Sequence, residues 1–270
     1  MTTTYEVVGK PVTRQEGPDK VLGTFLYSAD VNLPGMIWGK VLRSPFPHAK
    51  IVKIDASKAL AMPGVHAVIT GQDTLGMRIG RSVRDVPLLA EDEVRFVGEK
   101  VAAVAADSPD IAEEALLLIE VEYEPLPAIF DPIAAMEPDA PLVHDGSPSF
   151  ESSSGPIQPE GNVVNHSTWS SGDMKQGFSE SDQIFEHTFT TTWVHQGYME
   201  PYACVVDIDD AERVQVWANN KVPYTLRKQL ADALGLPEEQ IRVNPCGIGG
   251  DFGGKSPAMN VPLAYFLSRS

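Results

Sequence analysis

The chain has 270 residues, of which 43% are hydrophobic and 21% charged, and this composition is typical of a globular protein with one large or two ordinary domains. Its net charge of −16 argues against nucleic acid or an anionic membrane as a partner, since either requires a basic surface. No apolar run reaches the roughly 20 residues that span a bilayer. The first residues are neither basic nor apolar, and Cys204 and Cys246 lack zinc or redox spacing, so we expect a cytoplasmic protein with free thiols.

Residues 1–131 are predicted to form a compact α+β domain. Ser108 and Pro109 are typical of a helix start, and Ile111, Ala115 and Ile119 then recur on one helical face. The unbroken apolar run at residues 101–106 favours a buried central strand. Further strands are predicted at residues 36–42, 51–54, 65–69 and 121–124, with a short helix at residues 55–60. His48 and His66 are expected to be packed or surface histidines rather than ligands.

Residues 132–163 are rich in proline and serine and are predicted to form an extended linker over the surface. A second domain, residues 164–270, follows. Its predicted elements are a long strand at residues 185–194, a hairpin of residues 205–208 and 213–217, a helix from Pro223 that ends at Gly235, a strand at residues 241–243, and an apolar helical tail from Ala258.

A glycine-rich loop between the last strand and the tail is the strongest functional signal. Gly247, Gly249, Gly250, Gly253 and Gly254 surround a single aromatic residue, Phe252. Glycine lets the main chain approach a ligand closely, and a row of backbone N–H groups suits an anionic oxygen. The strand order also places residues 219–221 at a strand end, where side chains often face ligands.

Three interpretations of this loop compete. Residues 249–256 match G-x-x-x-x-G-K-S, the phosphate loop of nucleotide triphosphatases, but Pro262 interrupts the helix expected after it and the chain ends too soon for another strand. The dinucleotide fingerprint G-x-G-x-x-G fails because Phe252 occupies its third glycine position. A turn that binds nothing and a loop that holds another cofactor remain, and we favour the cofactor loop.

The loop sequence Gly249-Gly250-Asp251-Phe252-Gly253-Gly254-Lys255 resembles the G-G-x-F-G-G-K loop of the molybdenum hydroxylases, the group of xanthine dehydrogenase, aldehyde oxidase and carbon monoxide dehydrogenase. The Met199-Glu200-Pro201 and Leu234-Gly235-Leu236-Pro237 sequences are similar to family sequences in the same order. The first domain resembles the α/β hammerhead domain through Leu42-Arg43-Ser44-Pro45 and Val97-Gly98-Glu99. The resemblance implies a hammerhead domain followed by an incomplete molybdopterin-binding α+β domain.

This resemblance also implies a cofactor and partners. The cofactor is molybdenum–molybdopterin, expected in its cytosine dinucleotide form, and the reaction is oxidation of an N-heteroaromatic, aldehyde or similar C–H substrate with oxygen from water. Partner chains would supply a second half of the molybdopterin subunit, [2Fe-2S] clusters and FAD. The cofactor-binding residues would be Gly249, Gly250, Asp251, Phe252, Gly253, Gly254 and Lys221. No side chain would ligate the metal, and the backbone of Phe252 and Gly253 would lie nearest to it while the phenyl ring excludes water.

The sequence also departs from the family pattern. Lys221 stands where many members have a glutamine, and Ser256 stands where purine-oxidising members have a glutamate, which makes purines a less favoured substrate. Glu200 is expected to be a structural partner rather than a catalytic carboxylate, so no residue is assigned as acid, base or nucleophile. Because the chain ends at Ser270, we expect either a split subunit or a fragment. A cofactor-free accessory relative of the family is the remaining alternative.

Overall fold

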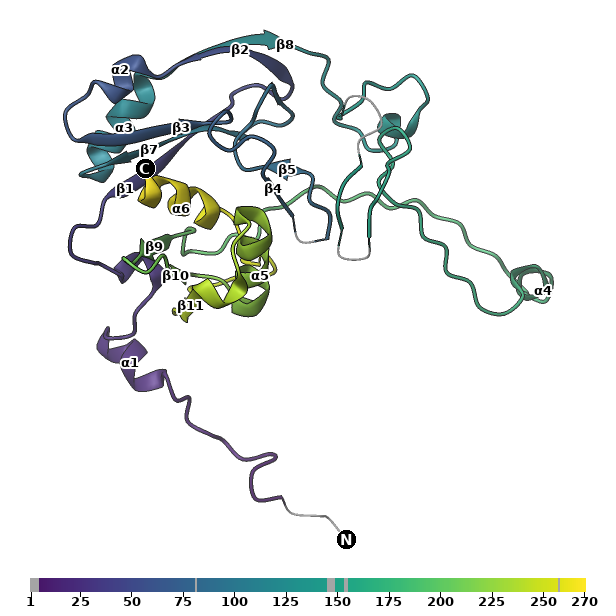
Figure 1. Ribbon diagram of the computed structural model, residues 1–270. Helices are drawn as coiled ribbons and strands as arrows, with labels where there is room; N and C mark the ends of the chain where they lie inside the picture. The colour runs from purple at the N-terminus through teal and green to yellow at the C-terminus, as the bar shows by residue number, and fades with distance from the viewer. Residues whose placement is uncertain (1–4, 81, 145–148, 153–154, 257) are drawn as a thin grey trace.

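The computed structural model describes residues 5–80, 82–144, 149–152, 155–256 and 258–270. The first four residues of the N-terminus, where no secretory signal is expected, lie outside the described part. Pro148, Ser153 and Ser154 of the predicted linker also lie outside it. Within the described residues, the strands form three three-stranded sheets and one two-stranded sheet, and Figure 1 shows their arrangement. No helix in the described ranges is long and apolar enough to cross a membrane.

The first half of the chain confirms the predicted α+β arrangement. Strand β7 (Lys100–Ala106) lies between β1 (Trp38–Arg43) and β3 (Val65–Thr70), antiparallel to both, and its apolar run is buried as expected. Helix α3 (Pro109–Leu117) packs on this sheet and is capped by Ser108, whose Oγ accepts a hydrogen bond from the Ile111 amide at 3.2 Å.

A second sheet has the order β6–β2–β8, with the short helix α2 leading from β2 toward β3. The bounds are β2 (Ala49–Asp55), α2 (Ser57–Leu60), β6 (Glu93–Val94) and β8 (Glu120–Pro125). The smaller elements that sequence reasoning did not identify are β6, α1 (Gly17–Leu22), η1 (Ser28–Asp30), β4 (Arg78–Ile79), β5 (Val86–Pro87), η2 (Ala134–Met136), α4 (Met174–Ser179) and η3 (Glu238–Gln240).

The last part of the chain forms a sheet of order β11–β10–β9. Strands β9 (Cys204–Ile208) and β10 (Val214–Ala218) are the predicted hairpin, and β11 (Ile241–Pro245) runs parallel to β10 after the crossover helix α5 (Pro223–Leu234). Helix α5 buries Leu226 and Leu230 against this sheet.

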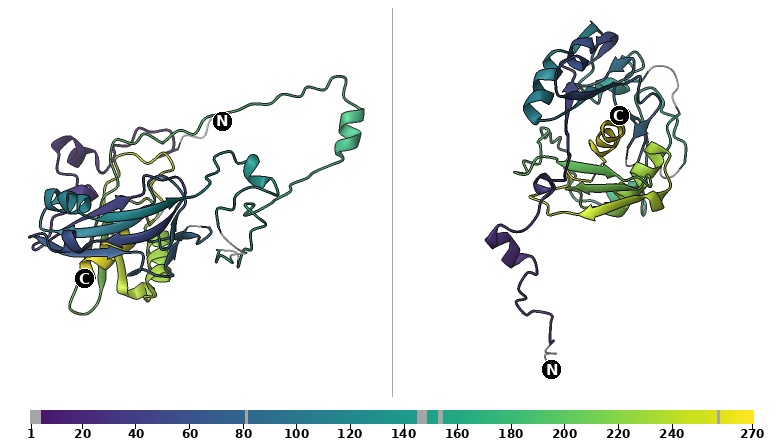
Figure 2. Two further views of the ribbon diagram at one scale, coloured as in Figure 1. Left: turned by 90° about the horizontal axis from the view of Figure 1, so that it is seen from above. Right: turned by 60° about the vertical axis from the view of Figure 1, so that its left-hand side comes forward.

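Helix α6 (Val261–Arg269) joins the two halves of the molecule. Its residues Val261 and Tyr265 pack in the core of the β9–β10–β11 sheet, whereas Leu263 and Leu267 pack in the core beneath β3 and β7. Figure 2 shows α6 between the two sheets. The predicted apolar tail is therefore a core element that the two sheets share.

The predicted long strand at residues 185–194 is wrong for this structure. These residues are extended and exposed, and they pair with no strand in the described part of the chain. Strand propensity reports how a side chain fits a half-buried pleated surface, and it cannot supply the neighbouring strand that a ladder requires.

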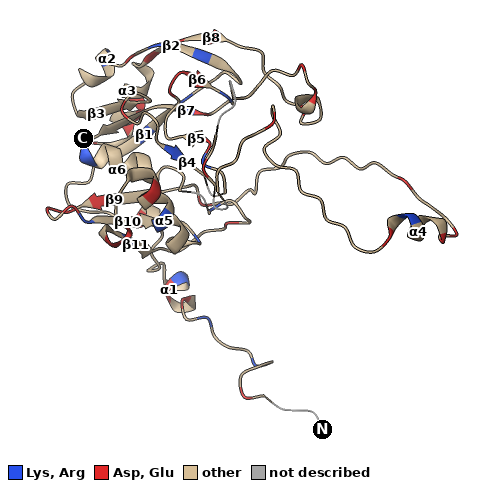
Figure 3. Cartoon of the chain, turned by 45° about the vertical axis from the view of Figure 1, so that its right-hand side comes forward, with Lys and Arg blue, Asp and Glu red and all other residues tan. Residues whose placement is uncertain are grey.

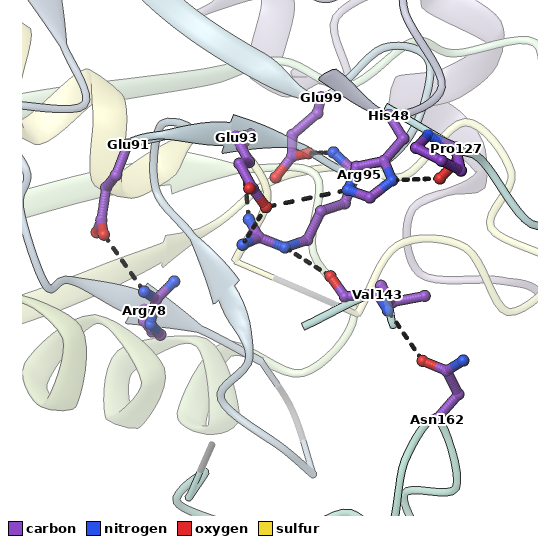
Figure 4. A network of polar contacts seen from close by, with 9 residues as sticks. All are labelled: His48, Arg78, Glu91, Glu93, Arg95, Glu99, Pro127, Val143 and Asn162. Carbon is purple, nitrogen blue, oxygen red and sulfur yellow. Dashed lines mark hydrogen bonds and ion pairs between the residues drawn. The ribbon is translucent and has the colours of Figure 1, made fainter. Parts of the chain in front are cut away.

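The predicted linker is anchored to the first half by the polar contacts drawn in Figure 4. His48 Nδ1 donates to the Pro127 carbonyl oxygen at 2.6 Å, and Arg95 Nε donates to the Val143 carbonyl oxygen at 2.9 Å. The amide of Val143 in turn donates to Asn162 Oδ1 at 2.9 Å. Pro127 precedes the linker, so its contact shows only that His48 is packed, as expected, whereas Arg95 ties the linker itself to the first half at Val143.

Charged residues of both signs are dispersed over the fold, as Figure 3 shows. Lysine and arginine appear among aspartate and glutamate on helices, strands and loops instead of forming a basic stripe in that view. The arrangement gives no support to nucleic-acid binding, which requires clustered basic side chains.

Replacing Gly71 with alanine is expected to destabilise the fold, because an added Cβ would lie 2.1 Å from the buried carbonyl oxygen of Ala90. We expect a loss of about 2 kcal/mol or more in the free energy of unfolding, measured by urea denaturation. Gly177→Ala in α4 is the matched control, since nothing lies within 4 Å of its added Cβ. Equal stability of the two variants would contradict the close approach at Gly71.

Candidate functional site

The glycine-rich loop leaves the end of β11 and lies beside the end of β10. The two strands are parallel, with Ala218 opposite Pro245, so the residues that follow each strand meet at one sheet edge. The Lys221 amide donates to the Lys255 carbonyl oxygen at 3.2 Å, and Lys221 Nζ donates to Asp251 Oδ2 at 2.5 Å. The structure therefore brings Lys221 to the loop, as the strand order predicted.

Asp251 organises the interior of the loop. Its Oδ1 accepts from the Lys255 amide at 2.5 Å, its Oδ2 also accepts from the Gly253 amide at 3.0 Å, and its carbonyl oxygen accepts from the Gly254 amide at 2.8 Å. The hydrogen bond from Lys221, followed by those from the loop amides, lowers the pKa of the Asp251 carboxyl. Asp251 is thus a carboxylate engaged by its own loop, a position suited to fixing loop shape.

A buried ion pair lies beneath the loop. The Lys255 side chain is 0% exposed, and its Nζ donates to Glu200 Oε2 at 2.5 Å while lying 4.8 Å from the centre of the Tyr198 ring. The same Glu200 oxygen accepts from the Gly249 amide at 2.7 Å. Glu200 is therefore a structural partner, as expected, and it ties both ends of the loop to residues 198–200. Its other oxygen, Oε1, is buried and has no partner in the described part of the chain.

Two of the glycines are required by close packing against residues 198–200. An added Cβ at Gly249 would lie 2.7 Å from Glu200 Cβ, and one at Gly254 would lie 2.7 Å from Tyr198 Cε1. Gly250 and Gly253 have φ values of 97° and 93°, which glycine tolerates best. Close packing thus explains why residues 249 and 254 are glycines. It does not explain the positive φ values at the loop tip, residues 250–253.

The tip of the loop carries backbone amides that have no acceptor in the described part of the chain. Phe252 has a φ of 45°, an uncommon conformation for a bulky residue, and its side chain is 75% exposed. The amides of Gly250, Asp251 and Phe252 donate to no acceptor among the described residues. The Gly253 amide donates to Asp251 Oδ2, so the amides without an acceptor in the described part of the loop are those of residues 250–252, and contact of Phe252 and Gly253 with a ligand stays a prediction.

The donor row fits an anionic group. Consecutive free amides in a turn that contains left-handed residues are the geometry that binds phosphate and oxo oxygens. Lys221 adds a positive charge beside the row, although its Nζ is engaged by Asp251. Two cavities lie elsewhere, one beside His48 and Phe130 and the other beside Arg84 and His144. Residues of the loop tip line neither of these cavities.

The thiols and the other ligand-type side chains do not form a centre of their own. Burial raises the pKa of Cys204 to about 12 and also raises that of Cys246, so both thiols are neutral near pH 7. No group of three or more histidine, cysteine, aspartate or glutamate side chains within the described ranges is arranged to hold a metal ion.

Two family models match the chain. Residues 22–127 match the α/β hammerhead domain of aldehyde oxidase and xanthine dehydrogenase, and residues 157–270 match the molybdopterin cofactor-binding domain. The chain is also 39% identical to a probable xanthine dehydrogenase subunit of Bacillus subtilis, over 97% of this chain and 34% of that protein.

The chain belongs to the aldehyde oxidase and xanthine dehydrogenase family.

Other family members share both the sequence and the fold. The nicotinate dehydrogenase large molybdopterin subunit of Eubacterium barkeri is 35% identical, over 93% of this chain and 56% of that protein. The crystal structure of quinoline 2-oxidoreductase from Pseudomonas putida superposes with a TM-score of 0.83 at 32% identity, over 96% of this chain and 33% of that one. The chain therefore spans about a third to a half of the length of these relatives.

The family fold also removes the phosphate-loop alternative. A phosphate-loop lysine must reach its nucleotide, whereas Lys255 is fully buried and paired with Glu200. The helix that follows starts at Val261 instead of directly after Ser256. The G-x-x-x-x-G-K-S match is thus a coincidence of spacing.

Sequence reasoning missed Tyr198 and Tyr202, and it placed Asn219 at a strand end without identifying its supporting role. Tyr198 packs on Gly254 and Lys255, and the Tyr202 hydroxyl donates to the Gly254 carbonyl oxygen. Asn219, which is buried, donates from Nδ2 to the Pro201 carbonyl oxygen at 2.7 Å. The two tyrosines flank Met199-Glu200-Pro201, and aromatic residues around a carboxylate were an available signal for a buried charge.

Lys100 connects the family's hammerhead sheet to the segment after the loop. It is partly buried on β7, and its Nζ donates to the Met259 carbonyl oxygen at 2.9 Å. Desolvation of the ammonium group, together with the charge of Arg43, lowers the Lys100 pKa from 10.5 to about 8. Between these values the unfolded chain binds more protons than the folded chain, so the stability contributed by Lys100 rises with pH.

We expect this contribution to disappear in Lys100→Met. Between about pH 8 and about pH 10.5, the stability of the wild type relative to the variant should rise by about 2 kcal/mol, measured by urea unfolding across that range. Parallel pH profiles for the two proteins would contradict the lowered pKa.

Proposed function

We propose that this chain forms one side of the cofactor site in the molybdopterin subunit of a molybdenum hydroxylase. The observation that carries the proposal is the row of three free amides at residues 250–252, held by the buried Lys255–Glu200 pair in a chain that matches a molybdopterin cofactor-binding model. When bound, molybdenum–molybdopterin supplies the two-electron oxidation, with oxygen taken from water.

This chain's residues bind and orient in that site. The amides of Gly250, Asp251 and Phe252 donate hydrogen bonds to anionic oxygens of the cofactor, and fixed main-chain donors need little rearrangement to do so. Lys221 holds Asp251 in place and adds positive charge beside the donors. The exposed Phe252 ring covers the open side and excludes water once the site is complete.

The proposed substrate is an N-heteroaromatic, aldehyde or similar compound with an oxidisable C–H bond. The names of similar proteins include xanthine, nicotinate and quinoline, which are all N-heteroaromatic, and this favours that class. The proposed partners are the remaining part of the molybdopterin subunit, an iron–sulfur chain with [2Fe-2S] clusters and an FAD chain, and the proposed cofactor form is the cytosine dinucleotide. Support for separate chains comes from relatives named as subunits.

Cofactor analysis tests the proposal directly. The chain is co-expressed with its neighbouring genes, the complex is purified, and molybdenum and pterin are measured together with the protein concentration. We expect about one molybdenum and one pterin per copy of the chain. A folded, stoichiometric complex without molybdenum or pterin would contradict the proposal and favour a cofactor-free accessory role. The observation that favours this second role is the ion pair of Lys221 with Asp251, which engages the lysine within the protein.

A further inference from the structure

Arg43 and Lys100 lie opposite each other in the first sheet, as partners in the antiparallel ladder of β1 and β7. Like charges at directly opposite positions of a sheet repel each other. Neither side chain forms an ion pair with a carboxylate among the described residues, although the sequence contains 37 aspartate and glutamate residues. The pair is therefore a local concentration of positive charge that no acidic side chain of the described chain offsets.

One cation, one thiol and one carbonyl group lie around the Lys100 amino group in the described part of the chain. Lys100 Nζ donates to the Met259 carbonyl oxygen at 2.9 Å, and Arg43 Nη1 donates to the Gly98 carbonyl oxygen at 2.8 Å. The thiol is that of Cys204 on β9, which is neutral near pH 7 because burial raises its pKa to about 12. The amino group thus faces a second cation and no anion.

Lys100 differs in this respect from the two lysines of the candidate site. Lys221 pairs with Asp251 and Lys255 pairs with Glu200, whereas Lys100 has Arg43 in the place of a carboxylate. Desolvation, together with the charge of Arg43, lowers the Lys100 pKa to about 8, so about half of the amine is uncharged at that pH. A lysine amine that is desolvated and lies beside another cation is an activated nucleophile.

We propose that Lys100 is a modification site, where the amine adds carbon dioxide to form a carbamate that pairs with Arg43. A C–N bond forms between the lone pair of Nζ and the carbon of carbon dioxide. One C=O bond of carbon dioxide becomes a single bond to a negatively charged oxygen, and one proton leaves Nζ for the solvent. The step changes no oxidation state and needs no further reactant.

The product matches both neighbours of the amino group. The carbamate nitrogen keeps one hydrogen, which still donates to the Met259 carbonyl oxygen. The new carboxylate places an anion opposite Arg43, so a repulsive cross-strand pair becomes an attractive one. The modification therefore stabilises the point at which the hammerhead sheet contacts the segment after the glycine-rich loop. This inference goes beyond the proposed function and does not require bound cofactor.

Chemical trapping tests the carbamate. The purified full chain is equilibrated at about pH 8 with carbon-13-labelled bicarbonate, carbamates are fixed by ethylation with a trialkyloxonium salt, and peptides are analysed by mass spectrometry. We expect ten-fold or more trapped label on Lys100 than on Lys175, which is exposed on α4, since an ordinary exposed lysine is almost fully protonated at this pH. Label on Lys100 no greater than on Lys175 would overturn the proposal.

Two arginine variants test the pairing with Arg43. Arg43→Gln removes the cation opposite Lys100, and trapping on Lys100 should fall about three-fold or more. Arg213→Gln is the matched control, because it removes an exposed arginine that pairs with Asp209, and trapping should stay unchanged. Amide exchange in β7 checks that both variants are folded. Undiminished trapping in a folded Arg43→Gln chain would contradict the pairing.

Carbon dioxide should also stabilise the folded chain. At about pH 8, the urea midpoint of the wild type should be higher in bicarbonate than in chloride of equal ionic strength. Lys100→Arg keeps the positive charge but offers no lysine amine, so its midpoint should be the same in both salts. An equal rise in both proteins would be a general salt effect and would count against the carbamate. Neither readout involves molybdenum, so failure here is distinguishable from failure of the proposed function.

Discussion

Lys255→Met is expected to lower the free energy of unfolding by about 3–5 kcal/mol, because it leaves the Glu200 carboxylate buried beneath the loop without its cation. The loss should be measurable by urea unfolding with an unchanged m-value. Among the described residues, Glu200 would retain only the Gly249 amide as a donor, so the loop should also exchange its amides faster.

Two controls isolate the buried pair. Lys228→Met removes an exposed lysine that pairs with Asp232, and a change below about 0.5 kcal/mol is expected. The double variant Glu200→Gln with Lys255→Met should recover part of the loss, because no uncompensated charge remains. A Lys255→Met protein within about 1 kcal/mol of the wild type would show that the pair contributes little.

Gly254→Ala is expected to reduce the molybdenum content of the purified complex at least ten-fold while the chain remains folded. The added Cβ would lie 2.7 Å from Tyr198 Cε1 and 3.3 Å from the Asp251 carbonyl oxygen, so the loop or its support must move. A shift of about 1 Å is enough to disrupt fixed main-chain donors. Metal analysis per folded protein is the measurement, with hydrogen exchange in β7 as the check on folding.

Gly177→Ala provides the matched control, since its added Cβ meets nothing within 4 Å and α4 lies far from the loop (Figure 1). Its molybdenum content should equal that of the wild type. Full molybdenum loading of Gly254→Ala would mean that the cofactor does not depend on the shape of this loop.

Local patterns were sufficient to predict most of the fold. The apolar run of β7, the Ser108 cap of α3 and the Pro223 start of α5 each encode an element within a few residues, and each is present. The strand at residues 185–194 failed because a ladder depends on a second strand that its own sequence does not specify. The role of α6 between two cores depends on tertiary packing, so periodicity could indicate only a helix.

The candidate site also has features that local sequence predicts and features that only the folded chain determines. Glycine spacing located the loop, and the order of strands placed Lys221 beside it. The Lys255–Glu200 pair joins residues 55 positions apart, and no local pattern pairs them. The choice of residues 250–252 as donors depends on the φ value of Phe252 and on the hydrogen bond from Gly253 to Asp251, which are properties of the folded loop.

A structure of the molybdenum-loaded complex tests the central claim most directly. We expect cofactor oxygens within about 3.2 Å of the amide nitrogens of Gly250, Asp251 or Phe252, with Lys255 still buried against Glu200. A cofactor bound away from these amides, or amides that donate to protein acceptors in the loaded complex, would contradict it.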